Sequence, residues 1–134
     1  RLPVPSTLCT NFTRVLIMIG EFVMKALHAR TNAHVLHLKS RSYARHIALG
    51  EFYDALVDLL DSYVEAYHGA FGIIEEYPGR YTYVDDPVKL VEGLCEHIDN
   101  NAEALSAGES SLKNILDELC ALCQQTSYKL RFLK

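Results

Sequence analysis

The sequence has neither an excess of positive charge nor a long apolar run. Its 134 residues carry a formal net charge of −4, whereas DNA binding without sequence preference needs clustered Lys and Arg. The longest apolar run, "VLIMIG" from Val15 to Gly20, is far shorter than the ~20 residues of a membrane span. Glu21 follows it too closely for the core of a signal peptide. We therefore expect no membrane and no DNA partner, and one globular domain over residues 1–134.

Cysteines are few and irregularly spaced. Cys9, Cys95, Cys120 and Cys123 form no regular disulfide pattern, which favours a reducing, cytoplasmic compartment. Cys120 and Cys123 make one C-x-x-C, a weak zinc signal without a second pair. Because this pair falls inside a strong helical pattern, we favour two small apolar residues on a buried helix face.

Glycine and proline are also sparse, and between them apolar residues recur at intervals of three and four. This pattern predicts four main helices, at about 7–39, 43–68, 87–105 and from 110 or 111 to the C-terminus. Ser42 is a candidate N-cap of the second helix, and Asp86-Pro87 reads as the cap and first residue of the third. No strand pattern appears. The long connection between the second and third helices lets them run parallel, so the expected fold is all-α, a ferritin-like four-helix bundle.

Acidic residues follow one face of the second predicted helix. Asp54, Asp58, Asp61 and Glu65 are spaced four, three and four residues apart, which places them in one stripe. A solvated acidic face is the commonest outcome of such a pattern. However, Asp61 and Glu65 lie among the apolar residues of "LVDLLDSYVEAY", and carboxylates near a buried face favour a bound cation.

Three of the six histidines, His34, His37 and His46, fall between residues 32 and 46. His46 and Asp61 are fifteen residues apart on one helix, or about 22 Å, so they cannot share an ion within one chain. A second, antiparallel copy of this helix across a two-fold axis could bring them together. Imidazole with carboxylates suits iron, manganese or zinc better than calcium. We interpret His37 as a polar residue of the helix end, with a supporting or ligand role as the alternative.

The spacing His34-x11-His46-x14-Asp61-x3-Glu65 resembles the ferroxidase signature of the Dps-type mini-ferritins. The run "FYDALVDLLDSYVEAY" resembles the family's aromatic and acidic segment. The resemblance implies that His34 and His46 of one subunit bind iron with Asp61 and Glu65 of its two-fold mate, with Glu65 bridging two irons. It also implies oxidation of Fe(II) to Fe(III) by peroxide or oxygen. Iron would be stored as ferric mineral if the dimers assemble into a dodecameric shell.

The chain departs from the usual family pattern at Val35, where Trp is usual, and at Ala66, where Arg commonly follows the ligand Glu. These differences indicate a divergent member and favour a phage-encoded one, in the cytoplasm of an infected bacterium or in a virion. The alternative function is a structural or interaction protein that keeps the bundle with a vestigial metal site.

Overall fold

The structure is a computed structural model that describes residues 6–134, with side chains from residue 12, and its regular elements are helices. They are α1 (Ser6–Lys39), α2 (Tyr43–Phe71), α3 (Pro87–Asn100), α4 (Ala102–Ser106) and α5 (Ser110–Phe132). The described part of the chain contains no strand, so the all-α prediction is confirmed. None of its helices has the length and apolar character needed to cross a membrane.

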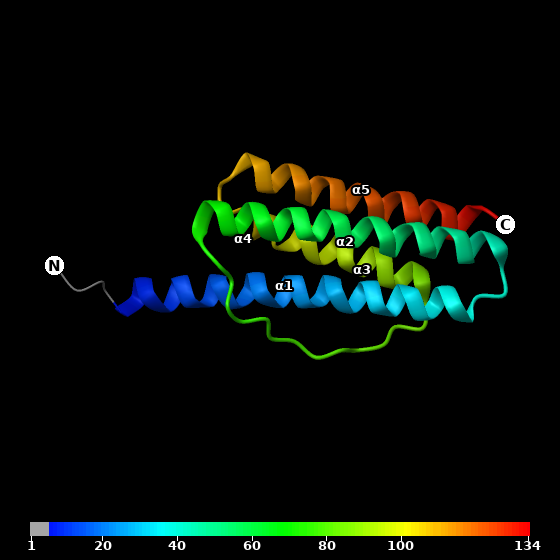
Figure 1. Ribbon diagram of the computed structural model, residues 1–134, viewed down its shortest axis with the longest axis horizontal. Helices are drawn as coiled ribbons and strands as arrows, with labels where there is room; N and C mark the ends of the chain where they lie inside the picture. Colours follow the sequence, from blue (N-terminus) through cyan, green and yellow to red (C-terminus); the bar gives the residue numbers. More distant parts are fainter. Residues whose placement is uncertain (1–5) are drawn as a thin grey trace.

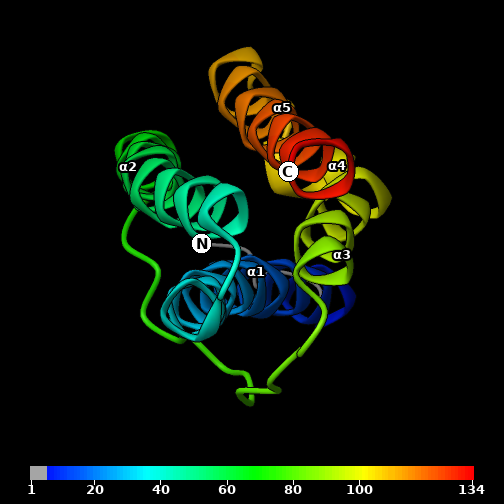
Figure 2. The same ribbon diagram turned by 90° about the vertical axis from the view of Figure 1, so that its right-hand side faces the viewer.

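The four long helices lie side by side, and each contacts two of the others (Figures 1 and 2). α1 packs against α2 and α3, while α5 packs against α2 and α3 from the other side. A link of three residues, 40–42, makes α1 and α2 antiparallel neighbours. In contrast, residues 72–86 run back along the outside of α1, so that α2 and α3 point in the same direction (Figure 1).

The two predicted N-caps are confirmed. The Ser42 hydroxyl accepts a hydrogen bond from the backbone N–H of Arg45 at 3.3 Å, at the start of α2. The Asp86 carboxylate accepts from the N–H groups of Val88 and Lys89 at the start of α3. These side chains satisfy backbone donors that have no partner inside the helix, and they fix where each helix begins.

Two helix ends differ from the prediction, the first by only three residues. α2 continues through Gly69 and ends at Phe71, with Gly72 in a left-handed conformation (φ +106°) as its C-cap. The single helix predicted over 87–105 is two helices, because α3 stops at Asn100. At the break, the Asn101 side-chain amide donates to the carbonyl of His97 at 2.8 Å, and the Asn101 N–H bonds to Ile98 three residues back. The side chain thus satisfies a carbonyl at the end of α3.

The core lies between the four long helices. α2 supplies one stripe of buried side chains with helical spacing: Leu49, Phe52, Leu56, Leu60, Tyr63 and Tyr67. Tyr63 is fully buried, and its hydroxyl donates to the carbonyl of Leu105 at 2.7 Å. Burial raises the pKa of Tyr63 far above its ordinary value, so the phenol stays protonated as the donor of this bond.

The connection between α2 and α3 is held against α1 at two points. Asn32 of α1 is 1% exposed, and its amide both donates to the carbonyl of Val84 (2.8 Å) and accepts from the N–H of Val84 (2.7 Å). Farther along α1, Gly20 lies directly beneath the carbonyl of Glu76, where no side chain would fit. These contacts keep residues 72–86 along one side of α1.

Asn32→Ala should destabilise the protein by about 2–3 kcal/mol, because two hydrogen bonds are lost and the Val84 peptide group is left without partners. The measurement is urea unfolding followed by circular dichroism. Asn114→Ala, at an exposed position of α5, is the matched control and should have little effect. An unchanged unfolding midpoint for Asn32→Ala would contradict this role of Asn32.

Candidate metal centre

Three histidines and a tyrosine meet where α1 and α2 are joined. His34 and His37 lie in the last turns of α1, and His46 lies in the first turn of α2. The His37 and His46 rings stack with their centroids 3.6 Å apart. His34 stacks on Tyr53 at 4.4 Å, and its centroid is 6.0 Å from that of His37. The corner therefore gathers all three histidines of the sequence cluster into one aromatic group.

His37 and His46 are also joined by a reciprocal pair of hydrogen bonds. The Nδ1 of His46 donates to the carbonyl of His37 at 2.9 Å, and the Nδ1 of His37 donates to the carbonyl of His46 at 2.6 Å. The His37 carbonyl belongs to the last turn of α1, where it lacks the usual helical partner four residues on and accepts from the Ser40 N–H at 3.3 Å.

These bonds fix which nitrogen of each ring carries the proton. A carbonyl oxygen only accepts, so Nδ1 holds the hydrogen in both rings, and Nε2 of each neutral imidazole keeps its lone pair. Metal-bound histidines commonly donate their second N–H to a backbone carbonyl, which orients the ring. His46 therefore has the tautomer that a metal ligand needs.

Gly50 makes room for this arrangement on α2. A Cβ atom at position 50 would lie 3.1 Å from Cε1 and 3.2 Å from Nδ1 of His37. Those separations are tighter than normal van der Waals contact, so a larger residue would push the His37 ring away from α2.

The carboxylates predicted to complete the site lie elsewhere in the single chain. Asp61 and Glu65 are exposed on α2 and make no hydrogen bond or ion pair among the residues described. Asp61 is about four turns from His46, or about 22 Å along the helix axis. The structure thus places the rings of His34 and His46 each next to that of His37, and separates His46 from Asp61.

One inference from the sequence is wrong. The apolar neighbours of Asp61 and Glu65 in the chain predicted that both acids lie near a buried face and need a cation. Both side chains are exposed, because the neighbouring Leu60 and Tyr63 point into the core from another side of the helix. Because these carboxylates are exposed to solvent, they do not need a bound metal to offset burial of their charge.

His37 has a larger role than the sequence predicted, since its ring contacts both other histidines. The available signal was Gly50, one helical turn after His46, because a glycine inside a helix often marks close contact with another group.

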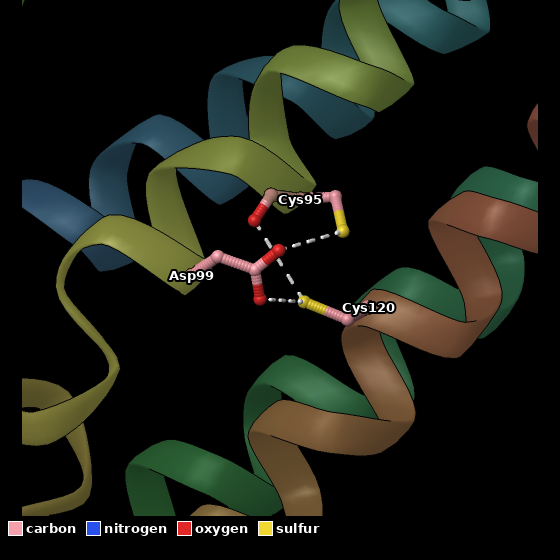
Figure 3. Close-up of side chains that lie close together, drawn as sticks. All are labelled: Cys95, Asp99 and Cys120. Atoms are coloured by element: carbon pink, nitrogen blue, oxygen red, sulfur yellow. Dashed lines mark hydrogen bonds between the residues drawn. The ribbon is translucent and has the colours of Figure 1, made fainter.

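A second group of metal-binding side chains was missed entirely. Cys95 and Asp99 of α3 face Cys120 of α5, and the three lie close together (Figure 3). The Asp99 carboxylate accepts from the Cys120 thiol at 3.5 Å and from the Cys95 thiol at 3.8 Å. The sequence signal was Cys95-x3-Asp99, one turn of a helix, but its partner Cys120 is recognisable only once α3 and α5 are packed together.

The C-x-x-C pair behaves as predicted, since Cys120 and Cys123 are both buried on α5. Burial raises the pKa of the Cys95 and Cys120 thiols and raises that of Cys123 to about 12. These thiols are therefore protonated at neutral pH in the metal-free chain. The Cys9 side chain lies outside the described residues.

Residues 37–130 match a protein family described as "Family of unknown function (DUF5856)". A protein of enterobacteria phage T4, described as an uncharacterized 14.6 kDa protein in the mobD-ri intergenic region, is 23% identical over 112 residues. That match covers 82% of this chain and 85% of the phage protein. No solved structure gives a significant match.

Gly50→Ala should bring none of the stability that alanine normally adds inside a helix, about 1 kcal/mol, because the new methyl group displaces His37. Gly93→Ala is the matched control, since a Cβ atom at position 93 of α3 would meet open space. Gly93→Ala should therefore stabilise the protein in urea unfolding.

In a His37→Ala background the obstacle is gone, and Gly50→Ala should then become stabilising. The same gain from Gly50→Ala in both backgrounds would contradict the steric role of Gly50.

Proposed function

The chain belongs to the family of unknown function DUF5856, and we propose that it is an iron-binding, ferritin-like protein of the mini-ferritin type. Its substrate is Fe(II), which binds between two chains, to His34 and His46 of one and to Asp61 and Glu65 of the other. The observation that carries the proposal is the His46 ring, whose Nδ1–H bonds the His37 carbonyl and leaves Nε2 free as a ligand.

The helix arrangement supports a ferritin-like bundle. Ferritin-like folds have one long crossover connection, which makes the second and third helices parallel. Here residues 72–86 form such a connection, and α1 and α5 each contact both α2 and α3 (Figure 2). In that class of bundle, metal ligands project from facing helices, so histidines and acids on α1 and α2 are in suitable elements.

A symmetric dimer is the geometry that completes the site. Suppose that two α2 helices pack antiparallel with His46 of one opposite Asp61 of the other. The two-fold axis then passes midway between positions 46 and 61, that is, between Tyr53 and Asp54. Glu65 then lies opposite Ser42, at the corner that holds the histidines. Each dimer has two equivalent sites, because a two-fold axis repeats every contact.

The surface around the corner supports a partner that covers it. Leu38, Tyr43 and Ile47 are exposed apolar side chains at the end of α1 and the start of α2. Apolar side chains gathered in one exposed region are a common mark of an interface. A second copy that covers them would also bring its own unpaired carboxylates to the histidines.

The donor set suits iron chemistry. Two imidazoles and two carboxylates offer nitrogen and oxygen ligands and leave positions open for an oxidant, a pattern that fits Fe(II). Two Fe(II) ions each lose one electron, and one hydrogen peroxide accepts both electrons and two protons to become two waters. His34 and His46 hold the iron, Asp61 is a terminal ligand, and Glu65 bridges the two ions and balances the charge of Fe(III).

The similarity to a phage T4 protein supports a phage origin. The iron chemistry then takes place in the cytoplasm of an infected bacterium or in a virion. If the dimers assemble further into a closed, dodecamer-like shell, the Fe(III) product is stored inside as mineral.

The decisive experiment mixes two inactive variants. His46→Ala and Asp61→Ala should each weaken Fe(II) binding at least about tenfold and slow peroxide-dependent oxidation, since each variant removes a ligand from both sites of the dimer. A mixed dimer contains one chain of each variant. In one of its two sites the histidines come from the Asp61→Ala chain and the acids come from the His46→Ala chain, so that site keeps all its ligands. With free exchange, half the dimers are mixed, so about a quarter of wild-type capacity should return.

The readouts are anaerobic Fe(II) titration and formation of ferric product after peroxide is added. Glu118→Ala, an exposed acid on α5, is the control and should behave as wild type. If mixing restores nothing, the two-chain site is wrong. If the wild-type chain binds no Fe(II), the function fails and a structural role on the same bundle becomes the better-supported function.

A further inference from the structure

We propose that Cys95, Asp99 and Cys120 form a zinc site between α3 and α5, separate from the histidine corner. The three side chains come from two packed helices on the opposite side of the bundle from the link between α1 and α2 (Figures 2 and 3). The site does not depend on the proposed iron chemistry or on a second chain.

The distances from the Asp99 oxygens to the two sulfurs are close to those around a tetrahedral ion. Zn–S bonds of ~2.3 Å and Zn–O bonds of ~2.0 Å at tetrahedral angles place sulfur and oxygen ligands about 3.5 Å apart and two sulfurs about 3.8 Å apart. One oxygen of the Asp99 carboxylate (Oδ1) lies 3.5 Å from the Cys120 sulfur, and the other (Oδ2) lies 3.8 Å from the Cys95 sulfur. One donor atom from each residue lies within 4.8 Å of the other two. Small side-chain rotations are therefore enough to close the site around zinc.

The backbone holds these donors in place. Cys95 and Asp99 are four residues apart on α3, so they project from the same face on successive turns. Cys120 projects toward them from the middle of α5. Because α3 and α5 pack directly against each other, the three donors are brought together without a flexible loop.

The chemistry of the donor set selects a soft or borderline ion. Two thiolates and a carboxylate suit zinc, whereas magnesium and calcium prefer oxygen ligands alone. Each thiol loses its proton to solvent when the metal binds. The two thiolates and the carboxylate then carry three negative charges, of which the dication neutralises two, so neither thiolate is left as an unpaired charge beside the partly buried Cys95.

The fourth position faces outward. Asp99 is exposed, Cys95 is half-buried, and both line a surface cavity of about 490 Å³. Water can therefore complete the coordination, which gives three protein ligands and one open position. Cys123 also lines this cavity, but its thiol is not among the donors that lie within 4.8 Å of one another, so it is not part of the set.

The test uses cobalt(II) as a coloured probe on the full chain, reduced and stripped of metal with a chelator. One equivalent of Co(II) per chain should produce the full visible absorption of a tetrahedral thiolate complex, and zinc should abolish this absorption. Asp99→Asn and Cys120→Ala should each weaken binding at least about tenfold. Asp99→Asn changes only an exposed side chain, so this variant should keep its fold, which circular dichroism checks.

Two control variants test whether the cobalt absorption arises from these three residues. Cys123→Ala removes the neighbouring thiol of the C-x-x-C and should leave the cobalt spectrum unchanged, as should His46→Ala. Loss of the spectrum in Cys123→Ala, or no thiolate absorption in the wild-type chain, would overturn the proposal.

Discussion

The three-residue link between α1 and α2 is the constraint from which most of the arrangement follows. It forces the two helices to lie antiparallel, and the reciprocal bonds between His37 and His46 fix how the end of one meets the start of the other. The same link places His46 at one end of α2, with Asp61 about 22 Å farther along the helix. A site that uses both residues is therefore necessarily a site between two chains.

The connection between α2 and α3 is long, and it has the opposite effect: it makes these two helices parallel. Residues 72–86 are long enough to return along α1, and the Asn32 amide fixes their path. Because of this return, α3 begins at the same end of the bundle as α2 and packs against both α1 and α5. The position of Cys95 and Asp99 opposite Cys120 is a consequence, since these donors meet only if α3 and α5 are neighbours.

What the sequence predicts well is local. The caps at Ser42 and Asp86 are recognisable because a side chain bonds to a backbone group two or three residues away. The exposure of Asp61 was misjudged because apolar neighbours in the chain were counted without regard to the helix face they occupy. The thiol cluster was missed for another reason: Cys95 and Cys120 are far apart in the sequence, and their contact depends on how two helices pack.

The two proposed sites differ in the softness of their ligands. This difference affects whether Fe(II) can bind to the histidine corner in competition with zinc. At a shared nitrogen and oxygen site, zinc binds more tightly than Fe(II), so free zinc would occupy the histidine corner first. Thiolates attract zinc more strongly than imidazole and carboxylate do. A site with two thiolates on α3 and α5 would therefore take up the first equivalent of zinc per chain, and the corner would stay open to Fe(II) until that site is full. Iron selectivity would then depend on the presence of the second site as well as on the ligands of the first.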